Sequence, residues 1–375
     1  MNQEQKPLSR PVFICGPSRS GTTLMSWVFR NQLKVAFVDE THYFPHLRKA
    51  FASRLDRPLT DSELDEFETY FFKTMWTSYR PAHFGKQKLY NAIDPALVRQ
   101  RCIDLGGRAD DFFEAFCLEY HAGCGGGAWG EKTPRHVFDI DEILAAFPDA
   151  AIVCMIRDPR AVVASFKDWH KNKIVTDDQG QTRKDFQRKR VERVFHPITI
   201  ATLCKGAFRA AQKAAEKHGS GQVRIIRFED LILSPHEVLS GLTEWLEIDA
   251  EIDPDNMPVS NSSYAKPDAG DAKGMNPAAV DRWRTTLSPA QIKVVEKTAS
   301  RMMVDAGYEP TNGSASFFSL AACYAGFIPS VIRAIIASRS RTGNLPSFVF
   351  KRIRMLFRSK PNSLQTSSAI LAFTP

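Results

Sequence analysis

The chain has 375 residues, of which 43% are hydrophobic and 25% are charged. This is an ordinary globular composition, sufficient for one large domain with insertions or for two smaller domains. The net charge of +8 arises entirely after Glu309, where the chain has Lys and Arg but no Asp or Glu, so residues 1–309 are formally neutral. A neutral body with a basic tail argues against a nucleic-acid-binding protein.

The seven cysteines have neither the spacing of metal ligands nor that of a disulfide framework. We interpret them as reduced thiols in a reducing compartment. The N-terminus is short and polar, without the pattern of a secretory signal or a membrane anchor. We therefore expect a cytoplasmic protein, with Cys15 and Cys154 in its core because both lie within apolar runs.

The first half of the chain alternates apolar runs with helical patterns. Residues 12–15 are an apolar run ending in Gly-Pro, and residues 21–33 have helical spacing, which together predict a strand, a Gly-rich turn and a helix. Residues 35–38 predict the next strand, which we expect beside the first. Residues 44–127 are helical in pattern and rich in aromatic residues, and we expect them to form a helical insertion that caps the site.

The second half continues this alternation. Its predicted elements are a short strand at 128–132, a helix at 139–148, a buried strand at 151–156, a helix at 196–219 and a strand leading into a turn at 223–235. Residues 171–197 are highly charged, which is typical of a solvated surface; a mobile substrate lid is the alternative. The alternation predicts an α/β, P-loop-like three-layer sandwich with a central parallel sheet, whose ligands bind beyond the carboxyl ends of the strands.

The segment "GPSRSGTT" has the spacing of a phosphate-binding loop without its lysine. Gly16 and Gly21 keep the glycine spacing, and Thr23 occupies the Ser/Thr position. Thr22 stands where the lysine belongs, and the cation of the loop is Arg19. Because that lysine grips the β- and γ-phosphates in kinases and ATPases, its absence weakens the case for a nucleoside triphosphate.

The strand at 151–156 ends in Arg157, whereas nucleoside-triphosphate enzymes place an acidic Mg²⁺ ligand at such a position. If a helix follows the turn, Ser165 lies one to two turns along it, and Arg157 and Ser165 reach one phosphate. The pattern predicts a nucleotide with two separate anionic groups and no metal ion.

Several segments resemble the sulfotransferases that use 3′-phosphoadenosine 5′-phosphosulfate (PAPS). "GPSRSGTTLM" is similar to their 5′-phosphosulfate loop, and "IRDPRAVVASF" is similar to their 3′-phosphate motif, with Arg157 and Ser165 at the family spacing. "GEKTPRH" is similar to a segment of the bacterial carbohydrate-type and tyrosylprotein-type branches, in which Arg at the position of Arg19 is also usual. The resemblance runs from residue 10 to about residue 305.

The resemblance implies PAPS as donor. It implies that the 5′-phosphosulfate is held by the loop residues Arg19, Ser20, Gly21, Thr22 and Thr23, and the 3′-phosphate by Arg157 and Ser165. Lys273 stands ten residues before Trp283, a spacing similar to one in tyrosylprotein-type members, and Lys273 and Arg282 both belong to the loop at this position. Either residue would contact the 3′-phosphate if that loop closes; a solvated loop is the alternative.

The family places its catalytic carboxylate in segments resembling "DETHYF", which makes Glu40 the candidate general base. A helix N-cap or a surface ion pair is the alternative for Glu40. His42 is the second candidate, since an imidazole titrates near neutrality, and His136 is a weaker one. Lys132 is the candidate second cation on the transferred group. Trp129 either stacks on adenine or packs in the core.

Residues 311–375 form a basic C-terminal extension to the predicted sulfotransferase domain of residues 1–310. The segment 317–337 is nearly long enough to span a membrane but contains Pro329 and Arg333. We expect residues 317–358 to lie on an anionic membrane surface; packing on the body or on a second subunit of a homodimer is the alternative.

The sequence therefore predicts a metal-free, PAPS-dependent sulfotransferase acting on a hydroxyl or amine of a small molecule, glycan or glycolipid. Two other functions stay open at this point: a nucleotide-dependent P-loop kinase with a degenerate loop, and a non-catalytic protein that binds membranes.

Overall fold

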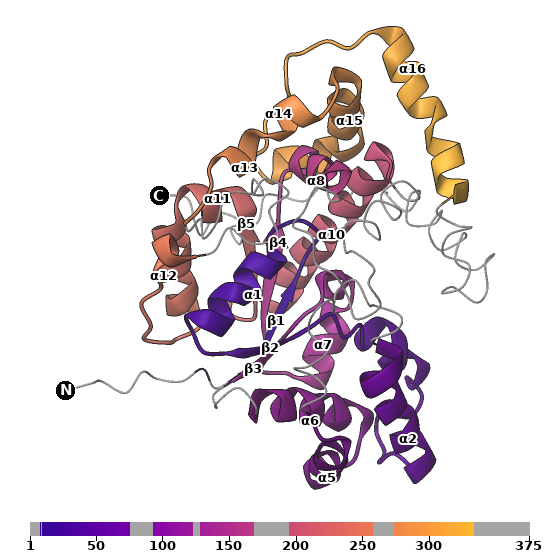
Figure 1. The fold of residues 1–375 in the computed structure, drawn as a ribbon, viewed down its shortest axis with the longest axis vertical. Coiled ribbons are helices and arrows are strands. Elements are labelled where there is room, and N and C mark those ends of the chain that lie inside the picture. Colours follow the sequence, from indigo (N-terminus) through magenta and orange to yellow (C-terminus); the bar gives the residue numbers. More distant parts are fainter. Residues whose placement is uncertain are drawn as a thin grey trace, which may run out of the picture.

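The computed structural model of the chain describes residue 8 and residues 10–75, 93–122, 128–168, 195–257 and 274–333. Within these residues, parallel strands form a 5-stranded sheet in the order β2-β3-β1-β4-β5 (Figure 1). The strands are β1 Val12–Cys15, β2 Ala36–Asp39, β3 Trp129–Lys132, β4 Ala151–Ile156 and β5 Val223–Arg227. The predicted strands are confirmed, and the turn predicted after β5 is instead the short helix α11 (Phe228–Leu233).

The expectation that the second strand lies beside the first is wrong, because β3 lies between them. Val12 of β1 is opposite Gly130 of β3, and Ala36 of β2 is opposite Trp129. Gly130 makes room for this pairing, since a Cβ there would lie 2.4 Å from the ring of Phe37. The end of β3 is therefore next to the loop that follows β1, and the end of β2 lies one strand further out.

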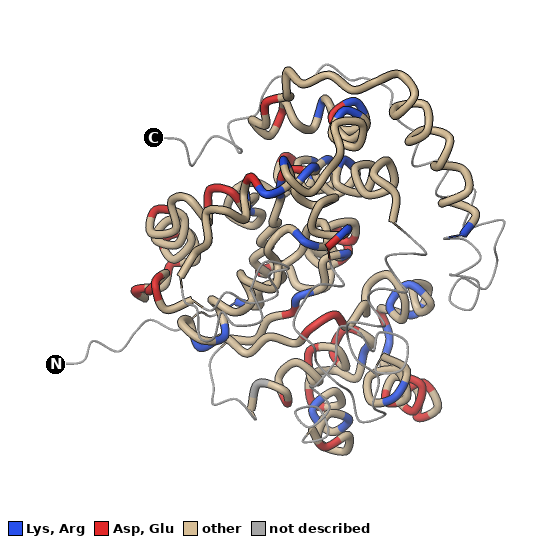
Figure 2. Tube along the Cα trace, turned by 45° about the horizontal axis from the view of Figure 1, so that its top comes forward, with Lys and Arg blue, Asp and Glu red and all other residues tan. Residues whose placement is uncertain are grey.

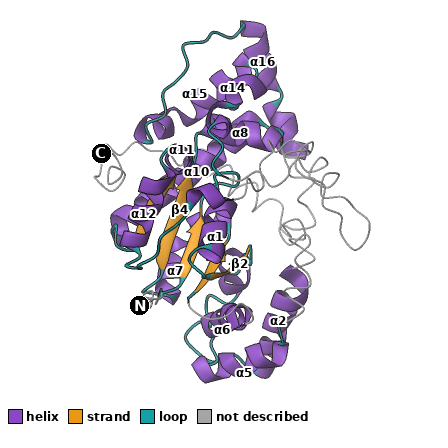
Figure 3. Ribbon diagram, turned by 60° about the vertical axis from the view of Figure 1, so that its left-hand side comes forward, coloured by secondary structure: helices purple, strands orange, loops and turns teal. Residues whose placement is uncertain are grey.

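Helices cover both faces of the sheet (Figure 3). Val12 and Ile14 of β1 point to the face covered by α1 (Thr22–Asn31), α11 and α12 (Pro235–Trp245). Phe13 and Cys15 point to the other face, covered by α6 (Ala109–Ala122), α7 (Ile140–Ala146) and α10 (Pro197–His218). This alternation along a strand buried on both faces confirms the predicted three-layer α/β sandwich.

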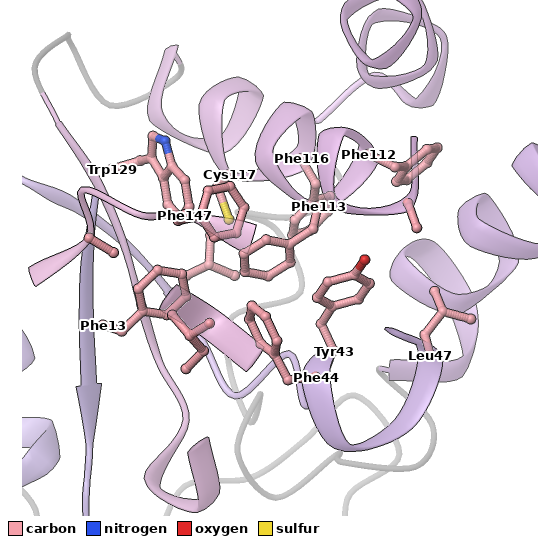
Figure 4. Packing of buried hydrophobic residues seen from close by; sticks show 14 of the residues in the cluster. Phe13, Tyr43, Phe44, Leu47, Phe112, Phe113, Phe116, Cys117, Trp129 and Phe147 are labelled. Carbon is pink, nitrogen blue, oxygen red and sulfur yellow. The ribbon is translucent and has the colours of Figure 1, made fainter. Parts of the chain in front are cut away.

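The described part of 44–127 is helical, as predicted. It consists of η1 (Phe44–Arg48), α2 (Asp61–Thr69), η2 (Tyr70–Thr74), α5 (Pro95–Leu105) and α6. Its aromatic side chains pack against the sheet (Figure 4): the ring of Phe113 stacks on that of Tyr43 with centroids 4.7 Å apart, and it meets the ring of Trp129 in β3 edge to face at 5.8 Å. Trp129 is thus a core residue, which removes it as a candidate for stacking on adenine.

A second group of helices lies beyond the carboxyl end of β4 (Figure 1). These are α8 (Pro159–Lys167), α13 (Ala278–Asp281), α14 (Trp283–Thr286), α15 (Pro289–Asp305) and α16 (Phe317–Ala325), with the 3₁₀ turns η3 (Pro134–Phe138) and η5 (Pro254–Asn256) elsewhere in the chain. Lys273 and most of the predicted lid 171–197 lie outside the described residues. No helix within the described residues has both the length and the apolar character that crossing a bilayer requires.

Cys15 and Cys154 are free and buried, as expected of core residues. They face each other across β1 and β4 with their sulfur atoms 3.4 Å apart, and burial raises the pKa of the Cys15 thiol well above its ordinary value. Both cysteines therefore act as small apolar side chains beneath the loop that follows β1.

Candidate active site

The loop between β1 and α1 has a backbone that requires glycine at two positions. Gly16 (φ 134°) and Gly21 (φ 92°) have positive φ. A Cβ at Gly16 would lie 2.1 Å from the carbonyl oxygen of Met155, and a Cβ at Gly21 would lie 2.6 Å from the ring of Phe228. Gly21 is also the N-cap of α1, with no side-chain cap, so the first N–H groups of the helix are not satisfied by a capping side chain. Such a helix N-terminus is an anion-binding feature.

Ser20 and Arg19 use their side chains differently. Ser20 is buried, and its hydroxyl hydrogen-bonds within the fold. The hydroxyl oxygen lies 2.5 Å from the carbonyl oxygen of Pro17 and 3.3 Å from the carbonyl oxygen of Met155, and it donates to these acceptors. Arg19 (φ 75°) donates from Nε to Oγ of Ser165 on α8 at 2.9 Å. The residue predicted for the 5′-phosphosulfate therefore contacts a residue predicted for the 3′-phosphate.

Arg157 follows β4 and is nearly fully buried. Its Nη1 donates to the carbonyl oxygen of Arg19 at 3.0 Å, and its Nη2 donates to the carbonyl oxygen of Ala279 at 2.8 Å. The guanidinium lies over the ring of Phe228, 4.0 Å from the ring centroid. Arg157 thus joins the loop to the segment that contains α13, and its buried Nε has no hydrogen-bond partner among the described residues.

The turn from β4 into α8 is held by a buried charge network. The backbone N–H of Asp158 donates to Glu229 at 3.0 Å. Arg160 pairs with Asp158 at 2.7 Å and with Glu296 at 2.9 Å, and its guanidinium lies 4.0 Å from the centroid of the Trp283 ring. These contacts position the helix that carries Ser165. The sequence analysis had not assigned these residues, although two of them lie within the motif "IRDPRAVVASF".

Arg282, predicted near the 3′-phosphate, lies at the C-cap of α13. Its Nη2 is 3.5 Å from Oδ2 of Asp168, which directly follows α8. The segment containing α13 and α14 is therefore attached to α8 at Asp168 as well as to Arg157 through Ala279.

Lys132 and Glu40 meet at the carboxyl ends of β3 and β2. Lys132 Nζ is 3.0 Å from Oε1 of Glu40 and 3.2 Å from Oδ1 of Asp39, and Asp39 also pairs with Arg30 at 2.7 Å. Lys132 and Asp39 are buried, whereas 28% of the Glu40 side chain is exposed. The neighbouring strands thus hold a buried cation against a carboxylate that solvent, and so an acceptor, can reach.

The backbone after β2 is unusual at both candidate bases. Glu40 (φ 50°) and His42 (φ 52°) are in the left-handed region, which is rare for residues other than glycine and is found often at functional sites. The N–H of Glu40 donates to the carbonyl oxygen of Lys132 at 2.8 Å, which continues the pairing of β2 with β3. His42 Nε2 lies 4.0 Å from Oε2 of Glu40. Burial lowers the pKa of His42 well below its ordinary value, and the Glu40 carboxylate offsets this only in part.

Glu131, a buried carboxylate that the sequence analysis did not single out, holds the backbone between Glu40 and His42. Glu131 accepts hydrogen bonds from the backbone N–H of Thr41 at 3.1 Å, from the Thr41 hydroxyl at 2.9 Å and from the Thr133 hydroxyl. His136 Nδ1 is 2.9 Å from its other oxygen. Burial raises the pKa of Glu131, but the charge of His136 and these hydrogen bonds outweigh burial and lower it.

This network shows the role of "GEKTPRH" in the fold. His136 is fully buried and packs edge to face on Phe44 with ring centroids 5.2 Å apart, which excludes it as a base that contacts an acceptor in this arrangement. Glu131 could have been found from strand alternation, since it neighbours Lys132 and must point to the opposite face of the sheet.

Within the described residues, no group of three or more His, Cys, Asp or Glu is arranged to hold a metal ion. Thr22 and Thr23 form the first turn of α1, where Thr22 is buried and Thr23 is half-buried. The strand–glycine loop–helix unit and the parallel sheet define a P-loop-like α/β protein with charged groups at its strand ends.

Comparison with known proteins identifies the family. The sequence profile described as "Sulfotransferase family" matches residues 11–252, and the chain belongs to this family. Nodulation protein NoeE of Sinorhizobium fredii (strain NBRC 101917 / NGR234) is 21% identical over 328 residues, which cover 82% of this chain and 68% of that protein. Mouse (Mus musculus) carbohydrate sulfotransferase 2 is 25% identical over 206 residues, which cover 47% of this chain and only 39% of that protein.

Solved structures include similar domains. The sulfotransferase domain of the Synechococcus PCC 7002 olefin synthase has 18% identity and a TM-score of 0.43, covering 80% of this chain and 98% of that one. The sulfotransferase domain from the curacin biosynthetic pathway has 15% identity and a TM-score of 0.44, covering 81% of this chain and 100% of that one.

Proposed function

We propose that this sulfotransferase transfers a sulfuryl group from PAPS to a hydroxyl or amine of a carbohydrate or glycolipid, with Glu40 as general base. The observation that carries the proposal is the pairing of Glu40 with Lys132, 3.0 Å apart at the ends of β2 and β3, of which β3 is next to the strand that leads into the phosphate-binding loop. The name of the mouse relative, carbohydrate sulfotransferase 2, supports the choice of a carbohydrate acceptor.

The residues present fit an anionic nucleotide. The N-terminus of α1 lacks a side-chain cap, and the buried Nε of Arg157 has no hydrogen-bond partner among the described residues. Arg19 and the loop N–H groups, with Thr22 and Thr23, would hold the 5′-phosphosulfate. Ser165 and Arg157 would hold the 3′-phosphate, and Arg19 would reorient from Ser165 toward the transferred group. Such a donor, when bound, supplies the sulfuryl group and a bisphosphate leaving group.

Side chains of this chain would perform the remaining chemistry. Glu40 accepts the proton that the acceptor hydroxyl loses as its oxygen bonds to sulfur, a role worth about 10²–10⁴-fold in rate. Lys132 neutralises the negative charge that develops during transfer, and its place between two carboxylates fixes its orientation without a rearrangement during the reaction.

The helical insertion lies beside this pair. The hydroxyl of Tyr70 in η2 donates to the carbonyl oxygen of Thr41 at 2.8 Å, one residue after Glu40. An acceptor bound at the Glu40 carboxylate would therefore approach the insertion, and we assign acceptor selection to this side of the site.

Two measurements test the proposal. Calorimetry should show that adenosine 3′,5′-bisphosphate binds more tightly than ATP with Mg²⁺, and an assay with ³⁵S-labelled PAPS should show transfer to a lipid or polysaccharide fraction of the source cell. A preference for ATP with Mg²⁺ would overturn the choice of donor. Transfer only to small phenols would overturn the choice of acceptor.

A further inference from the structure

The last described helical segment has an apolar face that is exposed to solvent. The segment consists of α16 and the helical residues 327–333. Phe317 is 78% exposed and Phe318 is 83% exposed. The C-terminal apolar face, as we term it, consists of Phe317, Phe318, Tyr324, Ile328 and Ile332. Large apolar side chains gathered on one exposed element mark a surface that associates with another apolar body.

The opposite side of the segment is attached to the protein body. His196 at the N-cap of α10 accepts at Nδ1 from the N–H of Ile198 at 3.3 Å, which leaves Nε2 to donate to the carbonyl oxygen of Cys323 at 3.1 Å. The rings of His196 and Phe327 have centroids 5.3 Å apart, and Ser330 is buried. The segment lies at the outer edge of the C-terminal helices (Figures 1 and 3). The exposure of its large apolar side chains shows that the C-terminal apolar face is turned toward solvent.

Charge indicates what covers this face. The chain has no charged residue between Glu309 and Arg333, and the segment is accordingly uncharged up to its end in Figure 2. From Arg333 onward the sequence has only basic charged residues, namely Arg333, Arg339, Arg341, Lys351, Arg352, Arg354, Arg358 and Lys360. An apolar face followed by a purely basic stretch is complementary to a bilayer rich in acidic lipids, whose acyl chains are apolar and whose headgroups are anionic.

We propose that the C-terminal apolar face inserts into the interface of an anionic bilayer, to which the basic charge of the sequence from Arg333 onward attracts the protein. A second copy of the chain is the less favourable occupant, because it would bring two equally basic tails together against a body that is formally neutral. The segment lies on the bilayer and does not cross it, because one side is attached to α10 and a turn at Gly326 separates its two short helical pieces. This inference is independent of the donor and acceptor proposed above.

Cosedimentation of the full-length chain with lipid vesicles tests the inference. We expect binding to vesicles of equal parts phosphatidylcholine and phosphatidylglycerol, little binding to pure phosphatidylcholine, and a steep loss of binding as salt is added. The double variant Phe318→Asp/Ile328→Asp should bind the mixed vesicles no better than it binds vesicles of pure phosphatidylcholine. Leu233→Asp on α11 is the matched control, because Leu233 is 60% exposed and outside the face; it should bind like the wild type.

Circular dichroism of the double variant should match that of the wild type, since both substituted side chains are exposed. If the double variant unfolds, the lipid and salt dependence of the wild type decides the inference. The inference would be overturned if the wild type did not bind mixed vesicles, or if a folded double variant bound them as well as the wild type does. It would also be overturned if sedimentation equilibrium showed that the wild type is a dimer, that the two substitutions dissociate this dimer, and that vesicles leave it intact.

Discussion

Lys132 Nζ lies between Oε1 of Glu40 at 3.0 Å and Oδ1 of Asp39 at 3.2 Å. Only Glu40 of these two carboxylates is substantially exposed, because Asp39 is buried and also paired with Arg30 at 2.7 Å. The arrangement separates a structural carboxylate from one that an acceptor can reach, and it depends on β3 lying between β1 and β2.

Lys132→Gln should lower kcat by about 10²–10³-fold, because it removes a preorganised cation from the reacting group. The fold should persist, since Arg30 still neutralises Asp39. Steady-state kinetics with labelled PAPS, together with thermal unfolding, checks this. Lys34→Gln is the control, because Lys34 is exposed and precedes the amino end of β2, the end opposite the site. A weaker affinity for the donor with an unchanged kcat would show that Lys132 only binds substrate.

His42→Gln should leave the pH dependence of kcat unchanged between about pH 6 and pH 8, because burial keeps the pKa of His42 well below its ordinary value of about 6.5. The imidazole is then neutral throughout this range and a weak base. A pH–rate profile for the variant and the wild type checks this. Loss of a titration step in the variant would transfer the role of base from Glu40 to His42.

Glu131→Gln should reduce kcat about tenfold with little change in KM, because Glu131 holds Thr41, the residue between Glu40 and His42. Loss of charged hydrogen bonds should also reduce the free energy of unfolding by about 1–3 kcal/mol near neutral pH. Glu142→Gln on the exposed side of α7 is the control. Equal effects on kcat for both variants would contradict a positioning role.

The stability effect of Glu131 should depend on pH. Its pKa in the folded protein is lowered, and an unfolded Glu has a pKa of about 4.3. The ionised carboxylate therefore contributes stability above the unfolded pKa, and the contribution disappears as the pH falls through the folded pKa. Urea unfolding of wild type and Glu131→Gln should show a difference that shrinks in acid; a constant difference would mean that the carboxylate charge is not involved.

Ser165→Ala should weaken binding of adenosine 3′,5′-bisphosphate about tenfold, or about 1.4 kcal/mol, because the hydroxyl would donate to the charged 3′-phosphate. Binding of adenosine 5′-phosphate, which lacks that group, should change little. Calorimetry with both ligands checks this. Equal losses for both nucleotides would assign Ser165 to positioning Arg19, to which it is hydrogen-bonded at 2.9 Å.

The strands and the phosphate-binding loop could be predicted because each is specified locally. "VFIC" and "AIVCMI" are apolar runs buried on both faces, and Gly16 and Gly21 are required by the loop backbone itself. The position of β3 was not predictable in this way, because strand order depends on how the chain returns to the sheet after residues 44–127. The sequence showed no feature that would place Lys132 rather than Glu40 next to the loop.

Contacts between residues far apart in the sequence could not be predicted either. Arg157 donates to the backbone of Arg19 and of Ala279, residues that no spacing in the sequence connects to it. Strand alternation places Glu131 on the face opposite Lys132, but its charge gives no sign that it is buried. Its burial is favourable because the backbone and side chain of Thr41, the Thr133 hydroxyl and the nearby His136 satisfy its carboxylate.

The rate of sulfuryl transfer by Glu40→Gln, measured in single turnover with ³⁵S-labelled PAPS, tests the central claim most directly. The account predicts a rate lower by about 10²–10⁴-fold, with the affinity for adenosine 3′,5′-bisphosphate unchanged. Transfer at the wild-type rate by a folded variant would contradict it.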